Sequence, residues 1–157
     1  IWLTEFAVKR KIVAKSFFGE EAGAGDEGEF RKIMNSIRDG FDSEKIWDEQ
    51  HLEDQLIIHL KAKFENMRIE RQQSAPSGGR VDILIEGKYV LELKVPRSRD
   101  DLRNLSAQLE EYKEDFPYVC AVIADTQNVD EGEIKTYVDR YKSKYNVPSV
   151  VKVVTKR

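Results

Sequence analysis

The spacing of hydrophobic side chains predicts a helix and a β-hairpin near the middle of the chain. Over residues 48–66, apolar side chains recur every three or four positions, as on one face of a helix. Two short runs rich in β-branched residues, at 80–85 and 89–95, flank the turn sequence Glu86-Gly87-Lys88. Two such runs around a glycine-containing turn are typical of a hairpin.

The second half of the chain alternates between helical and strand periods. Helical stripes run over 98–114 and 130–145, a short strand is expected at 67–73, and residues 118–124 are continuously apolar, as in a strand covered on both faces. A last strand is expected at 147–155. The order of helix, three strands, helix, strand, helix and strand predicts an α/β sandwich with a mixed sheet, in which an antiparallel hairpin is followed by crossover helices.

The first 47 residues carry weaker signals. Residues 1–18 have no clean period and are compatible with a helix or a strand, whereas the acidic, glycine-rich stretch 19–29 predicts a loop. A short helix is expected at 29–38. We therefore divide the chain into an N-terminal extension, 1–47, and a main domain, 48–157.

Composition limits the classes of protein that the chain can represent. Its 157 residues suit about one domain, and the formal net charge of −3 excludes a globally basic nucleic-acid binder but not a local basic patch. One cysteine, Cys120, and two histidines exclude an internal disulfide and a Cys/His zinc site. No apolar run approaches the roughly 20 residues that cross a bilayer, and no signal-peptide pattern is present. We expect a cytoplasmic protein without a membrane partner. The first residue, Ile1 rather than Met, is compatible with a domain cut from a longer chain.

Four charged residues stand where the hydrophobic pattern predicts burial. Glu53 falls within the apolar face of the predicted helix, and Asp82 interrupts a strand of valine, isoleucine and leucine, where aspartate is disfavoured. Glu92 and Lys94 alternate with apolar residues and so share one face of the next strand. A buried carboxylate must be paired, protonated or bound to a metal. Two simpler interpretations stay open: a frayed helical turn that lets Glu53 reach water, and an edge-strand charge at Asp82 that blocks aggregation.

The stretch GGRVDILIEGKYVLELK, together with the helix before it, resembles the core of the PD-(D/E)xK nuclease superfamily. In that family a helix glutamate, a strand aspartate and a strand Glu-x-Lys converge at one edge of the sheet. Glu53, Asp82, Glu92 and Lys94 match those positions in type and order. The resemblance covers residues 48–125 and implies a restriction-endonuclease-like fold, a three-layer sandwich with a mixed central sheet flanked by helices.

A second motif and a basic run follow the hairpin. The segment QLEEY resembles the Gln-x-x-x-Tyr motif of the RecB-like branch, which implies that Gln108 and Tyr112 brace the active-site strand and contact the nucleic acid. A core tyrosine beside a boundary glutamine is the alternative. The basic run of Lys94, Arg97, Arg99 and Arg103 is expected to hold phosphates that flank the cleavage point, or else to lie at a solvated helix start.

The resemblance implies Mg²⁺ as the cofactor, with Mn²⁺ as a substitute. Asp82, Glu92 and the backbone carbonyl of Leu93 would be metal ligands, and Glu53 would hold a metal-bound water or a second ion. Lys94 would orient the attacking water or stabilise the developing negative charge. Mg²⁺ suits carboxylate ligands because it prefers oxygen and retains several waters, and it can both neutralise phosphoryl oxygens and supply a nucleophilic water.

The length of the hairpin loop decides whether Asp82 and Glu92 can meet. A two-residue turn at Glu86-Gly87 would place Asp82 opposite Leu91 and point it away from Glu92. A three-residue loop makes Asp82 and Glu92 direct partners, because a shift of one residue moves a side chain to the other face. We therefore predict an odd-length loop or a β-bulge in this hairpin.

These patterns lead us to expect a divalent-metal-dependent nuclease that hydrolyses phosphodiester bonds, with DNA as the substrate that the resemblance implies and RNA as an alternative. A homodimer, or additional domains upstream of Ile1, would supply more binding surface. Two competing interpretations remain. One is a catalytically inactive nuclease-fold module that binds nucleic acid or a protein partner, and the other is an unrelated α/β interaction domain in which these charges are incidental.

Overall fold

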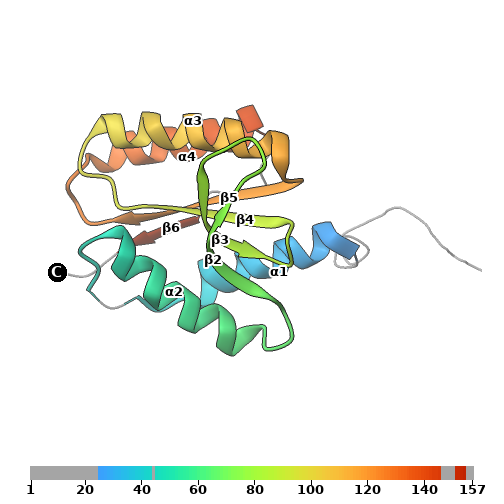
Figure 1. The fold of residues 1–157 in the computed structure, drawn as a ribbon. Helices are drawn as coiled ribbons and strands as arrows, with labels where there is room; N and C mark the ends of the chain where they lie inside the picture. The colour runs from blue at the N-terminus through green and yellow to red at the C-terminus, as the bar shows by residue number, and fades with distance from the viewer. Residues whose placement is uncertain (1–24, 44, 146–150, 155–157) are drawn as a thin grey trace, which may run out of the picture. The chain divides into compact units, whose positions relative to one another are not determined.

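The described part of the chain is an α/β structure built around one mixed sheet. The computed structural model describes residues 25–43, 45–145 and 151–154. Five strands in this part form the sheet in the order β2-β3-β4-β5-β6 (Figure 1). Their bounds are β2 Ile69–Ser74, β3 Arg80–Ile85, β4 Tyr89–Lys94, β5 Tyr118–Asp125 and β6 Val151–Val154. The strands from β2 to β4 are antiparallel and those from β4 to β6 are parallel, so the predicted mixed sheet is confirmed.

Helices cover both faces of this sheet. In Figure 1, α3 (Arg99–Asp115) and α4 (Glu131–Tyr145) lie on one face, and α2 (Glu49–Lys63) lies on the other. α3 contacts β4, β5 and α4, whereas α2 contacts β2 and β4. The crossover helices expected after the hairpin are therefore α3 and α4, and both pack against the same face.

The chain divides into two compact units, Ile1–Asn35 and Ser36–Arg157. The division falls inside helix α1 (Gly25–Gly40), earlier in the chain than the boundary after residue 47 that we expected from the sequence. The sheet and helices α2 to α4 all belong to the second unit.

Helix α1 corrects one prediction. A loop was expected over 19–29, but residues 25–29 are helical, while residues 1–24 lie outside the described part. Glycines suggested a loop, yet Asp26 and Glu27 stand in the first turn, where negative charge is favourable to the helix dipole. Apolar side chains then recur at helical spacing over the rest of the helix: Phe30, Ile33, Met34 and Ile37.

The main core lies between the sheet and the layer of α3 and α4. The stripe predicted for α3 is buried, and it packs with Val90 of β4 and with alternate residues of β5. The members of α3 and its C-cap are Leu102, Leu105, Leu109, Tyr112 and Phe116. On the other face, α2 buries Leu52, Leu56, Ile57 and Leu60, as its periodicity predicted. Each helix is thus fixed by an apolar stripe, and charged residues on these stripes need a separate explanation.

The hairpin between β3 and β4 has the predicted three-residue loop. Ile85 pairs with Tyr89 and Ile83 with Leu91, which leaves Glu86, Gly87 and Lys88 outside the ladder. Glu86 and Gly87 have φ of 55° and 69°, a left-handed conformation that glycine adopts readily. The odd-length loop is therefore confirmed, and the same register continued by one residue places Asp82 opposite Glu92.

The carboxyl end of β4 organises the neighbourhood of the predicted site. Because β4 and β5 are parallel, both end at the same edge of the sheet. Helix α3 begins shortly after β4 and helix α4 shortly after β5, so the N-terminal turns of both helices lie along this edge. The antiparallel strand β3 begins there, and Asp82 is near its start.

Candidate active site

Asp82 and Glu92 are held together because each carboxylate accepts a hydrogen bond from the other strand's backbone. Oδ2 of Asp82 accepts from the amide of Leu93 at 2.8 Å, and Oε1 of Glu92 accepts from the amide of Asp82 at 3.4 Å. The two side chains thereby satisfy backbone amides just beyond the last paired residues, Ile83 and Leu91. As a result, the carboxylates of Asp82 in β3 and Glu92 in β4 lie next to each other.

Glu92 and Lys94 stand on the face of the sheet that α3 covers. In the parallel ladder Glu92 is in register with Ala121 and Lys94 with Ile123, and both partners belong to the core beneath α3. Residues in register on neighbouring strands point to the same face. The Glu92 side chain therefore lies beneath α3 and is only 3% exposed.

This environment changes the acidity of both carboxyl groups. Burial, and after it the negative charge of Asp82, raise the pKa of Glu92 to about 8, against the opposing effects of the Asp82 amide and the Lys94 ammonium. Burial also raises the pKa of Asp82, although hydrogen bonds from Leu93 and Gln72 oppose the rise. Two negative charges are thus disfavoured in this site, which suits a shared proton or a bound cation.

Glu53 reaches the same region from α2. Its carboxylate is 3% exposed and accepts hydrogen bonds from Arg71 Nε and Gln72 Nε2, each at 2.6 Å. Helix α2 is capped by Asp48, whose side chain accepts from the His51 amide, so the turn is not frayed and the interpretation that lets Glu53 reach water is wrong. Glu53 is instead a buried carboxylate compensated by charge and hydrogen bonding.

Gln72 links Glu53 to Asp82. Its register on β2 places it opposite Asp82, and its Nε2 also donates to Asp82 Oδ1 at 3.3 Å. Gln72 has a φ of 52°, an uncommon value for a residue with a side chain. Strain of this kind is often found at functional sites, where surrounding contacts hold it in place.

Three residues of this cluster were not predicted from the sequence: Glu49, Arg71 and Gln72. Glu49 Oε2 accepts from the Val95 amide at 3.0 Å, just beyond β4, and its negative charge raises the pKa of both Asp82 and Glu92. A sequence signal for Glu49 existed, because Glu49 and Glu53 are one helical turn apart and like charges at that spacing are unfavourable. No comparable signal marks the two β2 residues, whose role depends on register.

Lys94 is half-buried at the end of β4. Its positive charge lowers the pKa of Glu92, so the ammonium lies within electrostatic range of that carboxylate. In the described part of the chain Lys94 makes no hydrogen bond or ion pair with another side chain, and its ammonium is therefore available to a ligand.

Tyr112 closes the cluster from the α3 side. Its hydroxyl donates to the carbonyl of Arg80 at 2.8 Å and its side chain is buried, so it braces the start of β3 two positions before Asp82. Burial raises its pKa to about 12, and the charges of Glu92 and Asp82 contribute to that rise. Gln108, one turn earlier, has a buried Oε1 for which the described residues provide no hydrogen-bond donor. The bracing role implied for Tyr112 fits its contacts, and the role of Gln108 stays a prediction.

In the described part of the chain, neither Arg97 nor Arg99 forms an ion pair with Asp82, Glu92 or Glu53. Arg99 forms an ion pair with Glu133 of α4, and the backbone amide of Arg97 donates to Asp101 at 2.8 Å. Both side chains are exposed. In this structure the Arg99 guanidinium is therefore directed toward α4.

The acidic cluster has the donors for a weakly held hard cation rather than a closed metal cage. No set of three or more His, Cys, Asp or Glu side chains is arranged to hold a metal ion among residues 25–43, 45–145 and 151–154. Asp82 and Glu92 nevertheless offer two adjacent carboxylates in a site that disfavours both negative charges. That donor set fits Mg²⁺, which is often held by one or two carboxylates and keeps several waters.

Comparison with known proteins adds no family assignment. Neither the known protein-family models nor the curated proteins contain a match to this chain. Within the described residues, no helix combines the length and the apolar character needed to span a membrane.

Proposed function

We propose that this protein is a divalent-metal-dependent nuclease that hydrolyses phosphodiester bonds, with DNA as its substrate. The observation that carries the proposal is the pairing of Asp82 with Glu92 on a hairpin whose three-residue loop puts them in direct register. Lys94 follows on the same face of β4, and Glu53 approaches through Gln72. The PD-(D/E)xK superfamily, with its restriction-endonuclease-like fold, presents the same residue types in the same order.

In this proposal each charged residue of the cluster has a separate role in hydrolysis. Asp82 and Glu92 would hold Mg²⁺, with the carbonyl of Leu93 as a further ligand, and the ion would supply charge neutralisation at the phosphate and a more acidic water. Lys94 makes no hydrogen bond or ion pair with another side chain in the described part, and its ammonium would orient the attacking water or stabilise the negative charge that develops on the phosphate. Glu53, fixed by Arg71 and Gln72, orients Asp82 through the shared Gln72 amide.

A panel of substrates tests the proposal. Supercoiled, linear, single-stranded and branched DNA, and RNA, are incubated with the protein and Mg²⁺, Mn²⁺ or EDTA. We expect metal-dependent cleavage of at least one DNA substrate, lost in Asp82→Asn and Glu92→Gln. Glu110→Gln is the matched control, because Glu110 is an exposed carboxylate on α3 and its replacement is expected to leave cleavage unchanged. Cleavage that is equal in EDTA, or equal in Asp82→Asn, would refute the proposal.

A catalytically inactive module is the second candidate, and one observation favours it. Glu53 is already neutralised by Arg71, and the described acidic groups form no three-ligand metal cluster. In such a module Glu92 would stay protonated at neutral pH and pair with Asp82 without a cation. Nucleic-acid or protein binding that is unaffected by EDTA, with no cleavage of any substrate, would identify it.

A further inference from the structure

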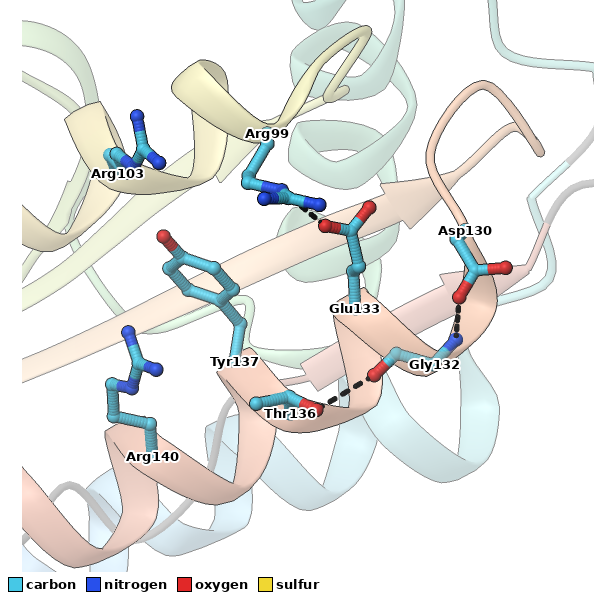
Figure 2. A pocket seen from close by; sticks show the side chains of 8 residues that line it. All are labelled: Arg99, Arg103, Asp130, Gly132, Glu133, Thr136, Tyr137 and Arg140. Atoms are coloured by element: carbon cyan, nitrogen blue, oxygen red, sulfur yellow. Dashed lines mark hydrogen bonds and ion pairs between the residues drawn. The ribbon is translucent and has the colours of Figure 1, made fainter.

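Apart from the acidic cluster, a second feature lies at the same edge of the sheet, between α3 and α4. It is an open cavity of about 410 Å³. Figure 2 shows the side chains that line it, from α3, from α4 and from the turn before α4. They are Arg99, Arg103, Asp130, Gly132, Glu133, Thr136, Tyr137 and Arg140. None of them takes part in the acidic cluster.

Three arginines line this cavity, and each guanidinium that phosphate would contact lies near a carboxylate or an aromatic ring. Arg99 pairs with Glu133, and Arg103 Nη1 lies 2.7 Å from Asp100 Oδ1, but the Arg103 side chain remains 63% exposed. The carboxylate of Asp130 accepts from the Gly132 amide. Among the lining residues three arginines stand beside two carboxylates, and Asp100, next to Arg103, brings the local formal charge to zero.

An aromatic ring lies among the arginines. Tyr137 is 8% exposed and packs in the core between α3 and the sheet, and in Figure 2 Arg103 and Arg140 flank it on either side. The guanidinium carbon of Arg140 lies 5.1 Å from the centre of this ring, a cation–π contact that orients the guanidinium. Planar guanidinium groups held in this way match the oxygens of a phosphate.

The amides at the start of α4 do not contribute to such a site. The Glu133 and Ile134 amides donate to the Asp130 carbonyl, and the Gly132 amide donates to the Asp130 carboxylate. Recognition in this cavity is therefore left to the arginine side chains.

The location of the cavity connects it to the acidic cluster. Helices α3 and α4 both begin at the edge where the parallel strands β4 and β5 end, and Lys94 is the last residue of β4. A chain of phosphates that enters at Lys94 and follows this edge passes over the first turns of α3 and then of α4.

From this placement we propose that the cavity between α3 and α4 binds a backbone phosphate of the nucleic-acid strand, outside the bond that is cleaved. The proposal rests on the proposed nuclease function, and it assigns Arg103 and Arg140 to substrate binding. Arg99 contributes when it exchanges Glu133 for phosphate. Glu133 then competes with the substrate, because its carboxylate occupies Arg99 in the free protein.

Because Glu133 competes with the substrate, the proposal predicts opposite changes in DNA affinity for the arginine variants and for Glu133→Gln. Binding of a fluorescent single-stranded and a duplex DNA oligonucleotide is measured by anisotropy in EDTA, with Asp82→Asn present in every protein so that no cleavage occurs. We expect Arg103→Ala and Arg140→Ala each to weaken binding about 5- to 10-fold at low salt, and to lower the slope of log Kd against log salt concentration by about one. Glu133→Gln is expected to tighten binding, because it releases Arg99 and removes a negative charge.

Arg68 and Glu70 provide a matched control pair outside the cavity. They form an exposed ion pair on the other side of the hairpin, and Arg68 is 63% exposed, the same fraction as Arg103. Arg68→Ala and Glu70→Gln change the net charge as the cavity variants do, so they are expected to alter affinity by less than about twofold. Thermal unfolding of each variant checks that the fold is retained.

Each outcome decides one of the two proposals. Equal effects in the cavity and control variants would overturn the cavity as a phosphate site and leave the nuclease proposal standing if the parent protein cleaves DNA. Competition by a mononucleotide at the concentration at which the oligonucleotide binds would also overturn it, since a strand would then not be the ligand. Binding that follows the expected pattern, together with no cleavage by the wild type under any metal condition, would support the cavity and refute the nuclease.

Discussion

Replacement of Glu92 with glutamine should stabilise the metal-free protein at alkaline pH. The folded protein raises the pKa of this buried carboxyl from its ordinary value of 4.5 to about 8. A carboxyl group whose pKa is raised by folding stabilises the fold at low pH, where it is protonated in both states. That stability is lost as pH rises through the interval between the two values, because the unfolded chain ionises first.

The size of the effect follows from the same two values. At about 1.4 kcal/mol for each pH unit, the rise to about 8 corresponds to a loss of at most about 5 kcal/mol between pH 4.5 and pH 8. Asp82 adds to the loss in the same direction, since burial raises its pKa as well. A loss of this size is a large fraction of the stability of a small domain. Glutamine keeps the shape of Glu92 and cannot ionise.

Urea unfolding in EDTA at pH 5.5, 7.0 and 8.5 measures the difference. We expect the wild-type free energy of unfolding to fall by several kcal/mol over this range, and that of Glu92→Gln to fall much less. Mg²⁺ at pH 8.5 should restore stability to the wild type and not to the variant, because it binds only the folded carboxylate pair. Glu110→Gln should keep the wild-type dependence, and a wild-type stability that is flat from pH 5.5 to 8.5 would refute the reasoning.

Three further predictions concern the surroundings of the pair. Lys94→Ala should lower kcat about 100-fold or more and change KM little, because the lysine ammonium acts on charge that develops in the transition state. Steady-state cleavage kinetics measure both constants, and equal kcat in wild type and variant would remove Lys94 from the mechanism. Arg71→Ala should destabilise the fold by about 3 kcal/mol by leaving the Glu53 charge buried without its cation, and Glu53→Gln should recover most of the loss in urea unfolding of the double variant. Tyr112→Phe should cost about 1 kcal/mol through the lost bond to the Arg80 carbonyl, seen in the same assay.

The parts of the fold that sequence periodicity predicts are those fixed by local physics. The apolar stripes of α2 and α3 and the continuous apolar run of β5 each require a particular element, and the structure contains all three. The odd loop of the hairpin could be predicted because only that register brings Asp82 and Glu92 to one face. The stretch 25–29 was misassigned, because glycine content outweighed the acidic first turn and the apolar spacing that follows it.

The rest of the site depends on contacts between elements that are distant in sequence. Glu53 was recognised because it stood on an apolar face, but its partners Arg71 and Gln72 lie on an ordinary polar strand and are brought to it only by the pairing of β2 with β3. Glu49 acts through a backbone amide beyond β4, a contact that its spacing from Glu53 does not predict. The arginine-lined cavity is similar, since it exists only where α3 and α4 pack side by side.

Calorimetric titration with Mn²⁺ at pH 7.0 tests the central claim most directly, because that claim is a cation site made by Asp82 and Glu92. The titration is run in two buffers of different ionisation enthalpy. We predict one site in the wild type, no measurable binding in Asp82→Asn, and release of about one proton per ion, since Glu92 with a pKa of about 8 is mostly protonated before the ion binds. Absence of binding in the wild type, or equal binding in Asp82→Asn, would contradict the account.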